Sequence, residues 1–441
     1  MRPRLSPDFS AKSVELYDMQ DLIAIDSTNL KTRILMVLAI LAALVFGWFT
    51  VRWQLGDMLA DLTPANDPNA SDLADTALNW SPSDPSAYLL KALATNDTAA
   101  AVEMFERAVR LSPNDYRRRV ELGRAYEQDG QTVRAESEFK KAVELAPAYA
   151  SARWNLGNFY LRQERVDEAV AELKKAAENS RTYRDQVFSL AWDYFGKDPA
   201  QIENLAGESP ESVAYLAYFF AARGRAQDAL RNWDRLSEGD KAGHRDILRV
   251  MAIGLYEQRR YPQALEFARQ YGADFDARPE AVTNASFETN LDGNADARFG
   301  WQIIRNDPRF EAITDTKVKH EGTRSLRVTI KSFVKPGLAN ILQTIVVEPN
   351  KKYRLHFWVR TENLKSAGGP LLEIVSGNDD KQIVRSQVFP AGTNDWQEID
   401  VDFTAPENCN GIIIRTGRMY CGEDCPLSGT FWYDDFELAG R

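Results

Sequence analysis

The period of the hydrophobic positions changes twice along the chain and divides it into three regions. Residues 34–51 form a continuous apolar run, residues from about 82 to 279 carry apolar positions at helical spacing, and from residue 280 apolar and polar residues alternate. These patterns predict a membrane span, helices and strands, respectively. We therefore expect a multidomain α + β chain with one transmembrane helix, a helical region and an all-β domain in that order.

The apolar run extends from Ile34 to Val51 and reads ILMVLAILAALVFGWFTV, with no charged residue among its 18 positions. As a helix it spans roughly 27 Å. Extension to residues 32–53 matches the ~30 Å hydrocarbon core of a bilayer, and Trp48 and Trp53 suit the membrane interface. We predict a transmembrane helix over residues 32–53. The alternative is a helix buried in a protein core.

The residues that flank this segment predict how it is anchored. No small-x-small cleavage motif follows it, and the run is longer than that of a typical signal peptide, which favours an uncleaved anchor. Lys31 and Arg33 adjoin its N-terminal end, whereas Arg52 alone lies close on the other side. The positive-inside rule then makes residues 1–31 a cytoplasmic tail and the rest of the chain extracytoplasmic. A bacterial inner membrane, with the bulk of the chain in the periplasm, is the expected setting.

Residues 54–81 separate the apolar run from the helical region. They hold Pro64 and Pro68 among Asp, Asn and Ser residues. Prolines interrupt helices and the small polar residues favour turns. We expect a stalk or linker with one short helix near residues 73–78.

Several positions of the helical region return after 34 residues. The first copy holds Ala101, Phe105, Ala108 and Pro113, the second Ala135, Phe139, Ala142 and Pro147, and the third Ala169, Leu173 and Ala176. A fixed period of this length is the signature of stacked helical hairpins, in which each unit packs on the next. Such an array predicts an extended surface that holds other molecules.

The helical region resembles the tetratricopeptide repeat. Leu122, Gly123 and Tyr126 stand at positions of the first helix of the motif, and Gly130 stands at the turn before the second helix. Small residues let two helices approach closely, and aromatic residues fill the space between hairpins. The resemblance implies a solenoid of five to six units over residues 82–279, with a groove that binds one or more protein partners.

The alternation that begins at residue 280 predicts short strands. One clear example is Tyr353, Leu355, Phe357 and Val359, with polar or amphipathic residues between them. Gly- and Pro-containing turn signals separate this strand from the next ones. Many short strands of this kind predict a two-sheet sandwich or jelly roll.

Several phrases of this region go beyond a generic sandwich. They are VTNASFE at residues 282–288, FGW at 299–301, HEGTRSLRV at 320–328, KYRLHFWVRTENL at 352–364, WQEIDVDFTAP at 396–406 and GTFWYDDFEL at 429–438. Their order and spacing resemble the jelly-roll carbohydrate-binding modules of the galactose-binding-like superfamily, over residues 281–441. The same fold also hosts protein-binding and purely structural members.

The resemblance implies a structural calcium ion near the two ends of the sandwich. Such modules use the glutamate of the opening segment and an aspartate of the closing Asp-Asp, which here are Glu288 and Asp435. Carboxylate oxygens are hard ligands that suit calcium. The alternative is that both carboxylates only accept hydrogen bonds from neighbouring backbone groups. No other cofactor is expected.

Strand alternation also predicts a candidate glycan-binding face. If the odd-numbered residues 353–359 point into the core, the even-numbered residues between them point outward. A tryptophan can stack on a sugar ring while polar groups bond its hydroxyls, and arginines suit an acidic polysaccharide. The residues predicted for this face are Trp358, His356, Arg360, Arg327, Glu373, Arg415 and Gln343. The alternative is that Trp358 packs under a loop and the charged residues are solvated.

The three cysteines of the chain, Cys409, Cys421 and Cys425, lie close together in the sequence. This clustering predicts one disulfide and a spare thiol, with all three pairings open, and it fits an extracytoplasmic location. A zinc site is the less favoured alternative, because no histidine lies near them.

Composition and motifs exclude several classes of function. The net charge of −10 argues against a nucleic-acid partner, because binding phosphates requires a basic surface. The sequence lacks a P-loop, a nucleophile elbow, a dinucleotide fingerprint and a His-Glu-x-x-His motif. A carboxylate pair for glycoside hydrolysis is the alternative that stays open, because Asp and Glu are abundant, although acidic residues on strand faces are usually solvated. We therefore predict that the protein is not an enzyme.

These observations together predict a membrane-anchored extracytoplasmic scaffold. Its repeats would tether a protein partner and its sandwich a glycan, in the service of envelope polysaccharide assembly or export. The alternative is a purely structural assembly factor whose sandwich docks protein and binds no sugar. A face of the sandwich covered by a loop or by the repeats would favour this alternative.

Overall fold

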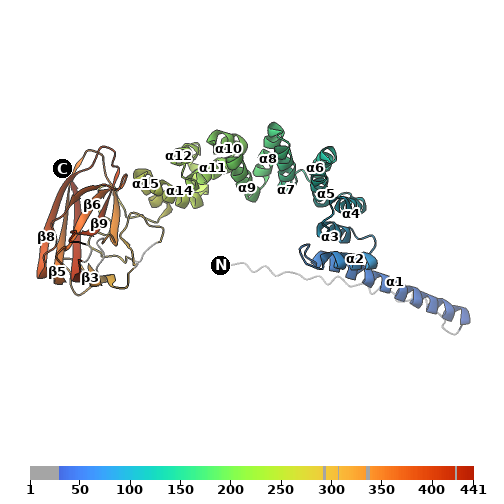
Figure 1. Cartoon of the computed structure of the whole chain (residues 1–441), viewed down its shortest axis with the longest axis horizontal. Coiled ribbons are helices and arrows are strands. Elements are labelled where there is room, and N and C mark those ends of the chain that lie inside the picture. The colour runs from blue at the N-terminus through green and yellow to red at the C-terminus, as the bar shows by residue number, and fades with distance from the viewer. Residues whose placement is uncertain (1–28, 292–294, 306, 334–337, 423–424) are drawn as a thin grey trace, which may run out of the picture. The chain divides into compact units, whose positions relative to one another are not determined.

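The computed structural model describes residues 29–441 except 292–294, 306, 334–337 and 423–424. The predicted cytoplasmic tail falls almost entirely on residues 1–28, outside the described residues. The chain forms two compact units, one ending at Asn179 and the other running from Ser180 to Arg441. Helices build the described part of the first unit, whereas the second unit combines helices with two β-sheets (Figure 1).

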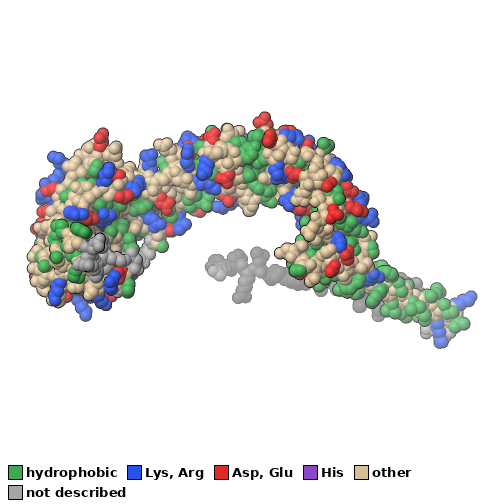
Figure 2. Space-filling view, in the orientation of Figure 1, with side chains coloured by type: hydrophobic (Ala, Val, Ile, Leu, Met, Phe, Trp, Pro, Cys, Tyr) green, Lys and Arg blue, Asp and Glu red, His purple; other side chains and the backbone are tan. Residues whose placement is uncertain are grey.

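Helix α1 runs from Leu30 to Leu62 and carries the apolar run. Asn29 caps its N-terminus by accepting a hydrogen bond from the backbone N–H of Lys31 at 3.1 Å. Its most apolar window has a mean hydropathy of 2.7, and none of that window is buried. Figure 2 shows hydrophobic side chains along the surface of this helix. Helix α1 is therefore long and apolar enough to cross a membrane.

The segment after the apolar run is more ordered than the predicted stalk. Helix α1 continues to Leu62, and α2 spans Ala70–Trp80, so the short helix expected near residues 73–78 is present and longer. Ala60 of α1, Ala77 of α2 and Ala87 of α3 (Pro85–Ala94) are buried against one another. Residues 54–81 are therefore more helical than the predicted linker, because these small side chains let α1 and α2 pack closely against α3.

Three hairpins carry the 34-residue period in the first unit. They pair α3 (Pro85–Ala94) with α4 (Thr98–Leu111), α5 (Tyr116–Gln128) with α6 (Thr132–Leu145), and α7 (Ala150–Arg162) with α8 (Val166–Asn179). Phe139 of α6 is fully buried against Gly123 of α5, where a β-carbon would lie 3.0 Å from the ring. Leu173 of α8 meets Gly157 of α7 in the same way. The glycines of the motif thus permit the close approach of the paired helices.

The second unit begins with seven further helices. They are α9 (Arg181–Tyr194), α10 (Pro199–Ala206), α11 (Pro210–Ala222), α12 (Ala226–Asp234), α13 (Glu238–Gly243), α14 (Arg245–Glu257) and α15 (Tyr261–Tyr271). Gly272, at a φ of +94°, ends α15 in the left-handed conformation that glycine adopts without strain.

In the part of the sandwich that the structure describes, the strands form two five-stranded antiparallel sheets. The first sheet has the order β1 (Gln302–Ile303), β4 (Ile341–Val346), β9 (Gly411–Arg418), β6 (Pro370–Ser376) and β7 (Gln382–Arg385). The second has the order β2 (Phe310–Asp315), β3 (Ser325–Phe333), β10 (Leu427–Gly440), β5 (Lys352–Lys365) and β8 (Gly392–Thr404). These orders and the helical repeats before them confirm the predicted helical repeat region followed by an all-β sandwich.

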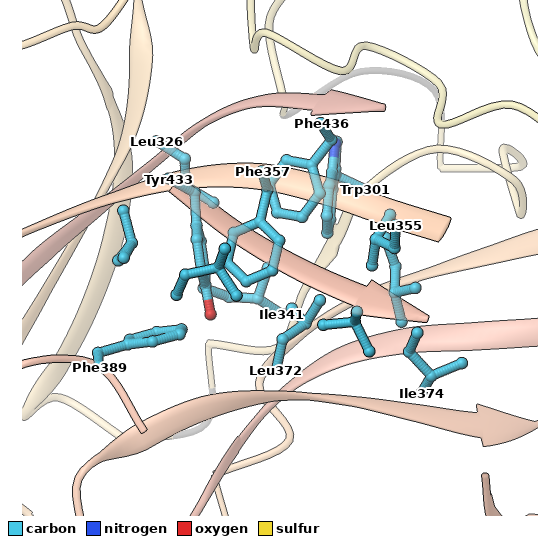
Figure 3. Packing of buried hydrophobic residues seen from close by; sticks show 14 of the residues in the cluster. Trp301, Leu326, Ile341, Leu355, Phe357, Leu372, Ile374, Phe389, Tyr433 and Phe436 are labelled. Carbon is cyan, nitrogen blue, oxygen red and sulfur yellow. The ribbon is translucent and has the colours of Figure 1, made fainter. Parts of the chain in front are cut away.

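The core of the sandwich lies between the two sheets. The odd-numbered apolar residues of β5 from Tyr353 to Val359 are buried, as strand alternation predicted. Phe357 stacks on Phe436 of β10 with ring centroids 5.0 Å apart, and Leu372 and Ile374 of β6 face them from the other sheet (Figure 3). Aromatic and branched side chains thus fill the interior from both sheets.

A disulfide joins Cys421 to Cys425, whose Cα atoms are 5.7 Å apart. Cys409 is a buried free thiol. The expected pattern of one disulfide and one spare thiol is therefore present, and the structure selects one of the three pairings that the sequence left open.

Candidate functional site

The outward-facing side chains of β5 carry the residues predicted for a glycan. Arg354, His356, Trp358 and Arg360 are half-buried and alternate with the buried core residues of that strand. In register beside Trp358 lie Asp434 of β10 and Glu398 of β8. The outer face of the second sheet therefore combines aromatic, basic and acidic side chains.

An aromatic cluster of His320, Trp358 and Trp396 lies on this face. His320 stacks on the indole of Trp358 with ring centroids 4.0 Å apart and an angle of 16° between the planes. Trp396 meets the edge of His320 at 5.7 Å. His320 comes from the loop before β3, so a loop residue covers part of the indole that was expected to bind sugar. This contact is the packing that the alternative interpretation of Trp358 proposed.

Two aspartates hold His320 in place. The backbone N–H of His320 donates to Asp434 Oδ2 at 2.8 Å, and its Nδ1 lies 2.8 Å from Asp435 Oδ2. Burial raises the pKa of Asp434 to about 6, and the charge of Asp435 adds to the rise, although backbone hydrogen bonds oppose it. The loop histidine is thus tied to the end of β10.

His356 forms a separate polar cluster with two carboxylates of β8. Its Nδ1 lies 3.3 Å from Glu398 Oε1 and 3.2 Å from Asp400 Oδ1. The ligand atoms of the three residues lie within 4.8 Å of one another, so they are placed to hold a cation or to hydrogen-bond hydroxyl groups. Next to them, Arg354 pairs with Asp402 through two 2.9 Å hydrogen bonds.

Arg327 and Arg360 lie on the same face on either side of Trp432. The Trp432 indole is buried and donates to Asp315 Oδ2 at 3.1 Å. Arg327 lies 3.5 Å from the same carboxylate oxygen, and the Arg360 guanidinium lies 5.9 Å from the indole centroid. Four of the seven predicted residues, Trp358, His356, Arg360 and Arg327, therefore share one face.

The other three predicted residues belong to the first sheet. Glu373 of β6 accepts hydrogen bonds from Arg415 of β9 and Arg385 of β7, each at 3.0 Å, and forms a separate ionic group. Gln343 is fully buried, contrary to the expectation that it is exposed. Its side chain donates to Thr283 O at 2.9 Å and accepts from Thr283 N at 2.8 Å. Gln343 thus fastens the opening segment of the domain to β4.

The two predicted calcium ligands lie beside the same loop of residues 320–324. Glu288 Oε1 accepts from the backbone N–H groups of Thr323 and Arg324 at 2.7 and 3.1 Å, and its Oε2 is bonded to the Thr323 hydroxyl. These hydrogen bonds lower the pKa of Glu288. Asp435 accepts from the Ser286 hydroxyl at 2.7 Å as well as contacting His320. Carboxylate oxygens from both ends of the domain therefore flank one loop, and this arrangement suits calcium. Hydrogen-bond donors of the protein already occupy these oxygens. The calcium ion stays a prediction.

The last helical hairpin covers part of the first sheet. Tyr256 of α14 hydrogen-bonds Thr344 of β4 at 2.7 Å. Tyr261 of α15 is buried, donates to Gly377 O at 2.7 Å and packs on Gly411 of β9. Arg259 adds an ion pair to Asp380 at 2.6 Å. One end of this sheet face is thus occupied by the helices of its own unit.

Sequence reasoning missed two members of the aromatic cluster. His320 and Trp396 both stand inside the phrases that carry the family resemblance, HEGTRSLRV and WQEIDVDFTAP. Strand periodicity does not place His320, because it lies in a loop. Trp396 lies on β8, where the alternation with Ile399, Val401 and Phe403 does predict an outward side chain. The presence of aromatic residues within these phrases was the signal that could have found them.

Two family models match the chain. The model described as a carbohydrate binding domain matches residues 279–416. The tetratricopeptide repeat model matches residues 90–150 and 120–183. Both resemblances are therefore confirmed: the chain carries tetratricopeptide repeats followed by a jelly roll of the carbohydrate-binding type. Domains of these two types are non-catalytic.

Individual relatives cover only parts of the chain. The tRNA(Glu)-specific nuclease WapA of Bacillus subtilis subsp. natto is 22% identical over 213 residues, which are 46% of this chain and 8% of the nuclease. The chain thus spans a small fraction of this relative. A solved CBM4 structure is 16% identical with a TM-score of 0.28 and covers 36% of this chain and 99% of its own. A thermophilic tetratricopeptide protein of Thermus thermophilus is 22% identical with a TM-score of 0.27, covering 31% of this chain and 78% of its own.

Proposed function

We propose that this protein is a membrane-anchored scaffold whose repeats hold a protein partner and whose sandwich binds a carbohydrate. The tetratricopeptide repeats support the first role and the carbohydrate-binding domain the second. Helix α1 supplies the anchor, which places the repeats and the sandwich outside the cytoplasm, in the periplasm of a bacterial cell. Anchoring raises the effective concentration of both partners, so individually weak contacts suffice for assembly. Envelope polysaccharide assembly or export is the process that such a tether suits.

The observation that carries the carbohydrate proposal is the outer face of the second sheet. Trp396 and Trp358 offer apolar rings beside His356, Glu398 and Asp400, whose polar atoms are spaced to bond sugar hydroxyls. Carbohydrate sites combine aromatic surfaces with a few polar groups in this manner. Because His320 covers part of Trp358, we assign the larger share of stacking to Trp396.

A glycan screen of the full chain in detergent tests this function. We expect saturable binding to at least one neutral or acidic glycan, reduced tenfold or more by Trp396→Ala and less by Trp358→Ala. Tyr420→Ala removes another exposed aromatic residue of the sandwich and serves as the matched control. If no glycan of the array binds to a chain that has native secondary structure, with calcium present, carbohydrate binding is contradicted.

A second candidate is a purely structural role for the sandwich. The contacts of Tyr256 and Tyr261 with the first sheet favour it, because the repeats themselves use that face. In this case the sandwich closes the end of the helical array and docks protein rather than sugar. This role would be favoured if no glycan binds in that screen and the repeats capture a defined protein partner.

We also propose that the chain has no catalytic activity of its own. We do not propose for this chain the tRNA nuclease activity that the name of WapA states, because the match covers 8% of that protein. The net charge of −10 further disfavours a nucleic-acid substrate. Incubation of the purified chain with tRNA, followed by gel analysis, should leave the tRNA intact.

A further inference from the structure

Strand β8 carries a row of outward-facing side chains on the proposed glycan-binding face. Trp396, Glu398 and Asp400 follow one another at two-residue steps, and each step measures roughly 7 Å along a strand. In the described part of the second sheet, β8 is the last strand in the order. An extended ligand that lies along this edge therefore meets an aromatic ring first and two carboxylates next.

The carboxylates of Glu398 and Asp400 are open to a ligand. Their side chains are 56% and 40% exposed. Nδ1 of His356 lies 3.3 Å from Glu398 and 3.2 Å from Asp400, and Arg354 lies 3.7 Å from Asp400. Because both neighbours of Nδ1 are hydrogen-bond acceptors, the proton of the imidazole lies on this nitrogen. One N–H group between two carboxylates leaves acceptor oxygens for a ligand that donates hydrogen bonds.

The arginines near these carboxylates do not offset the negative charge. From Arg354 to Arg360 on β5 and from Asp395 to Asp402 on β8, the paired strands hold two arginines and four carboxylates. Arg354 donates two 2.9 Å hydrogen bonds to Asp402, and Arg360 lies 3.8 Å from Asp395. This part of the two strands is therefore net negative whether or not His356 is protonated. Such a surface attracts cations and repels acidic sugars.

We propose that this face binds a polysaccharide of amino sugars whose amines are free rather than acetylated. The inference rests on the proposed carbohydrate binding and names the class of sugar. One sugar ring stacks on Trp396, and the ammonium group of a neighbouring sugar donates to Glu398 and Asp400. Such hydrogen bonds are charge-assisted, so they are stronger than those of a neutral hydroxyl group.

Other sugars fit this row of side chains less well. An acetamide or a hydroxyl in place of the amine carries no charge, so a neutral polymer with the same backbone stacks on Trp396 but gains no ionic contact. A uronic acid brings its own carboxylate toward Glu398 and Asp400, which repel it. The arginines therefore do not make this face a site for an acidic polysaccharide, although their residue type alone favours one.

Three oligosaccharides that differ at one carbon test the proposal. Pentamers of β-1,4-linked glucosamine, N-acetylglucosamine and glucose carry an ammonium, an acetamide and a hydroxyl at that position. Isothermal titration calorimetry measures their binding to the full chain in detergent, with a chelator present and in a mildly acidic buffer that keeps the amines protonated. We expect the glucosamine pentamer to bind at least about fivefold more tightly than the other two, since one exposed ion pair contributes up to about this factor. At ~1 M salt, where the screening length is about 3 Å, the preference should disappear.

A double variant, Glu398→Gln with Asp400→Asn, tests the two carboxylates. It preserves the size of both side chains but removes both charges, so the three pentamers should bind equally. Glu348→Gln with Glu407→Gln is the matched control, because it removes the same charge from two exposed loop positions of the sandwich and should keep the preference. Circular dichroism verifies that each variant is folded.

Equal affinities of wild type for the three pentamers would overturn the choice of amino sugar and leave the carbohydrate function standing. A preference that survives in the variant without both charges, or tighter binding of a galacturonic acid pentamer, would also overturn it. So would a preference that appears only when a divalent cation replaces the chelator, because His356, Glu398 and Asp400 would then hold a metal. If none of these sugars binds and the glycan screen finds no ligand, the proposed carbohydrate function fails together with this inference.

Discussion

Arg153 of α7 donates a hydrogen bond to Glu172 Oε2 of α8 at 2.6 Å and another to the carbonyl of Pro147 at 3.1 Å. Thirty-four residues earlier, Arg119 makes the same two contacts with Glu138 and Pro113, at 2.7 and 2.9 Å. Arg153 and Glu172 are 14% and 16% exposed at their side chains, so solvent screens this ion pair little. Both repeats thus join their two helices by an ion pair in addition to apolar packing.

This contact predicts a local loss of stability in Arg153→Met. The substitution removes two hydrogen bonds of a charged donor and leaves Glu172 partly buried, which should cost about 1.5 to 3 kcal/mol. Amide exchange in α7 and α8 should then accelerate about tenfold or more. Lys141→Met removes the exposed pair with Glu144 on α6 and should leave exchange nearly unchanged. Equal protection in Arg153→Met and wild type would mean that apolar packing alone holds the hairpin.

The packing of Tyr261 on Gly411 predicts a second effect. A β-carbon at Gly411 would lie 2.4 Å from the Tyr261 ring, so Gly411→Ala must displace either this ring or the strand beneath it. We expect a destabilisation of about 1 to 3 kcal/mol, measured by thermal unfolding of the full chain. Gly300→Ala is the control, because a β-carbon there meets no atom within 4 Å.

A double variant separates this clash from a general defect of β9. Tyr261→Ala removes the ring, so Gly411→Ala should cost much less in that background than in wild type. Strictly additive effects would show that Tyr261 and Gly411 do not contact each other in solution.

The sequence predicted the elements well where a periodic pattern is present. The 34-residue spacing of Phe105 and Phe139 located the hairpins, and the alternation from Tyr353 to Val359 located the inward face of β5. Both patterns follow from the geometry of single elements, which the local sequence determines.

The candidate site was predicted less completely for a topological reason. Alternation tells which side of a strand a residue faces, but not which sheet the strand joins. Trp358 on β5 and Glu373 on β6 both point away from the core, yet β5 and β6 belong to opposite sheets. Gln343 is an inward-facing polar residue whose backbone partner, Thr283, lies 60 residues earlier. Nonlocal partners of this kind leave no periodic signal in a single sequence.

Removal of calcium tests the predicted metal site at Glu288 and Asp435. If calcium binds there, saturating it at about 100 times its dissociation constant should stabilise the sandwich by about 2.7 kcal/mol relative to the chelated protein. Glu288→Gln should lose this response, whereas the exposed Glu362→Gln should keep it. Identical unfolding temperatures in calcium and in chelator would contradict the calcium site. Both carboxylates would then serve only as hydrogen-bond acceptors within the protein.

The buried carboxyl of Asp434 predicts a pH dependence of the sandwich. Its pKa is raised to about 6, chiefly by burial, from an ordinary value near 3.8. A raised pKa means that the folded state binds the proton more tightly than the unfolded state. The stability contributed by protonation is therefore fully present below about pH 4 and is lost as the pH rises through 6. The loss amounts to on the order of 2 to 3 kcal/mol by pH 8.

Asp434→Asn should flatten this part of the pH profile, because the amide stays neutral at every pH between 5 and 8. The difference in unfolding free energy between the variant and wild type should thus grow in favour of the variant as the pH rises. Asp402→Asn, whose carboxylate is exposed and paired with Arg354, should leave the slope between pH 5 and 8 as in wild type. A parallel shift of the whole profile in Asp434→Asn would instead show that Asp434 is already ionised at pH 5 in the folded protein.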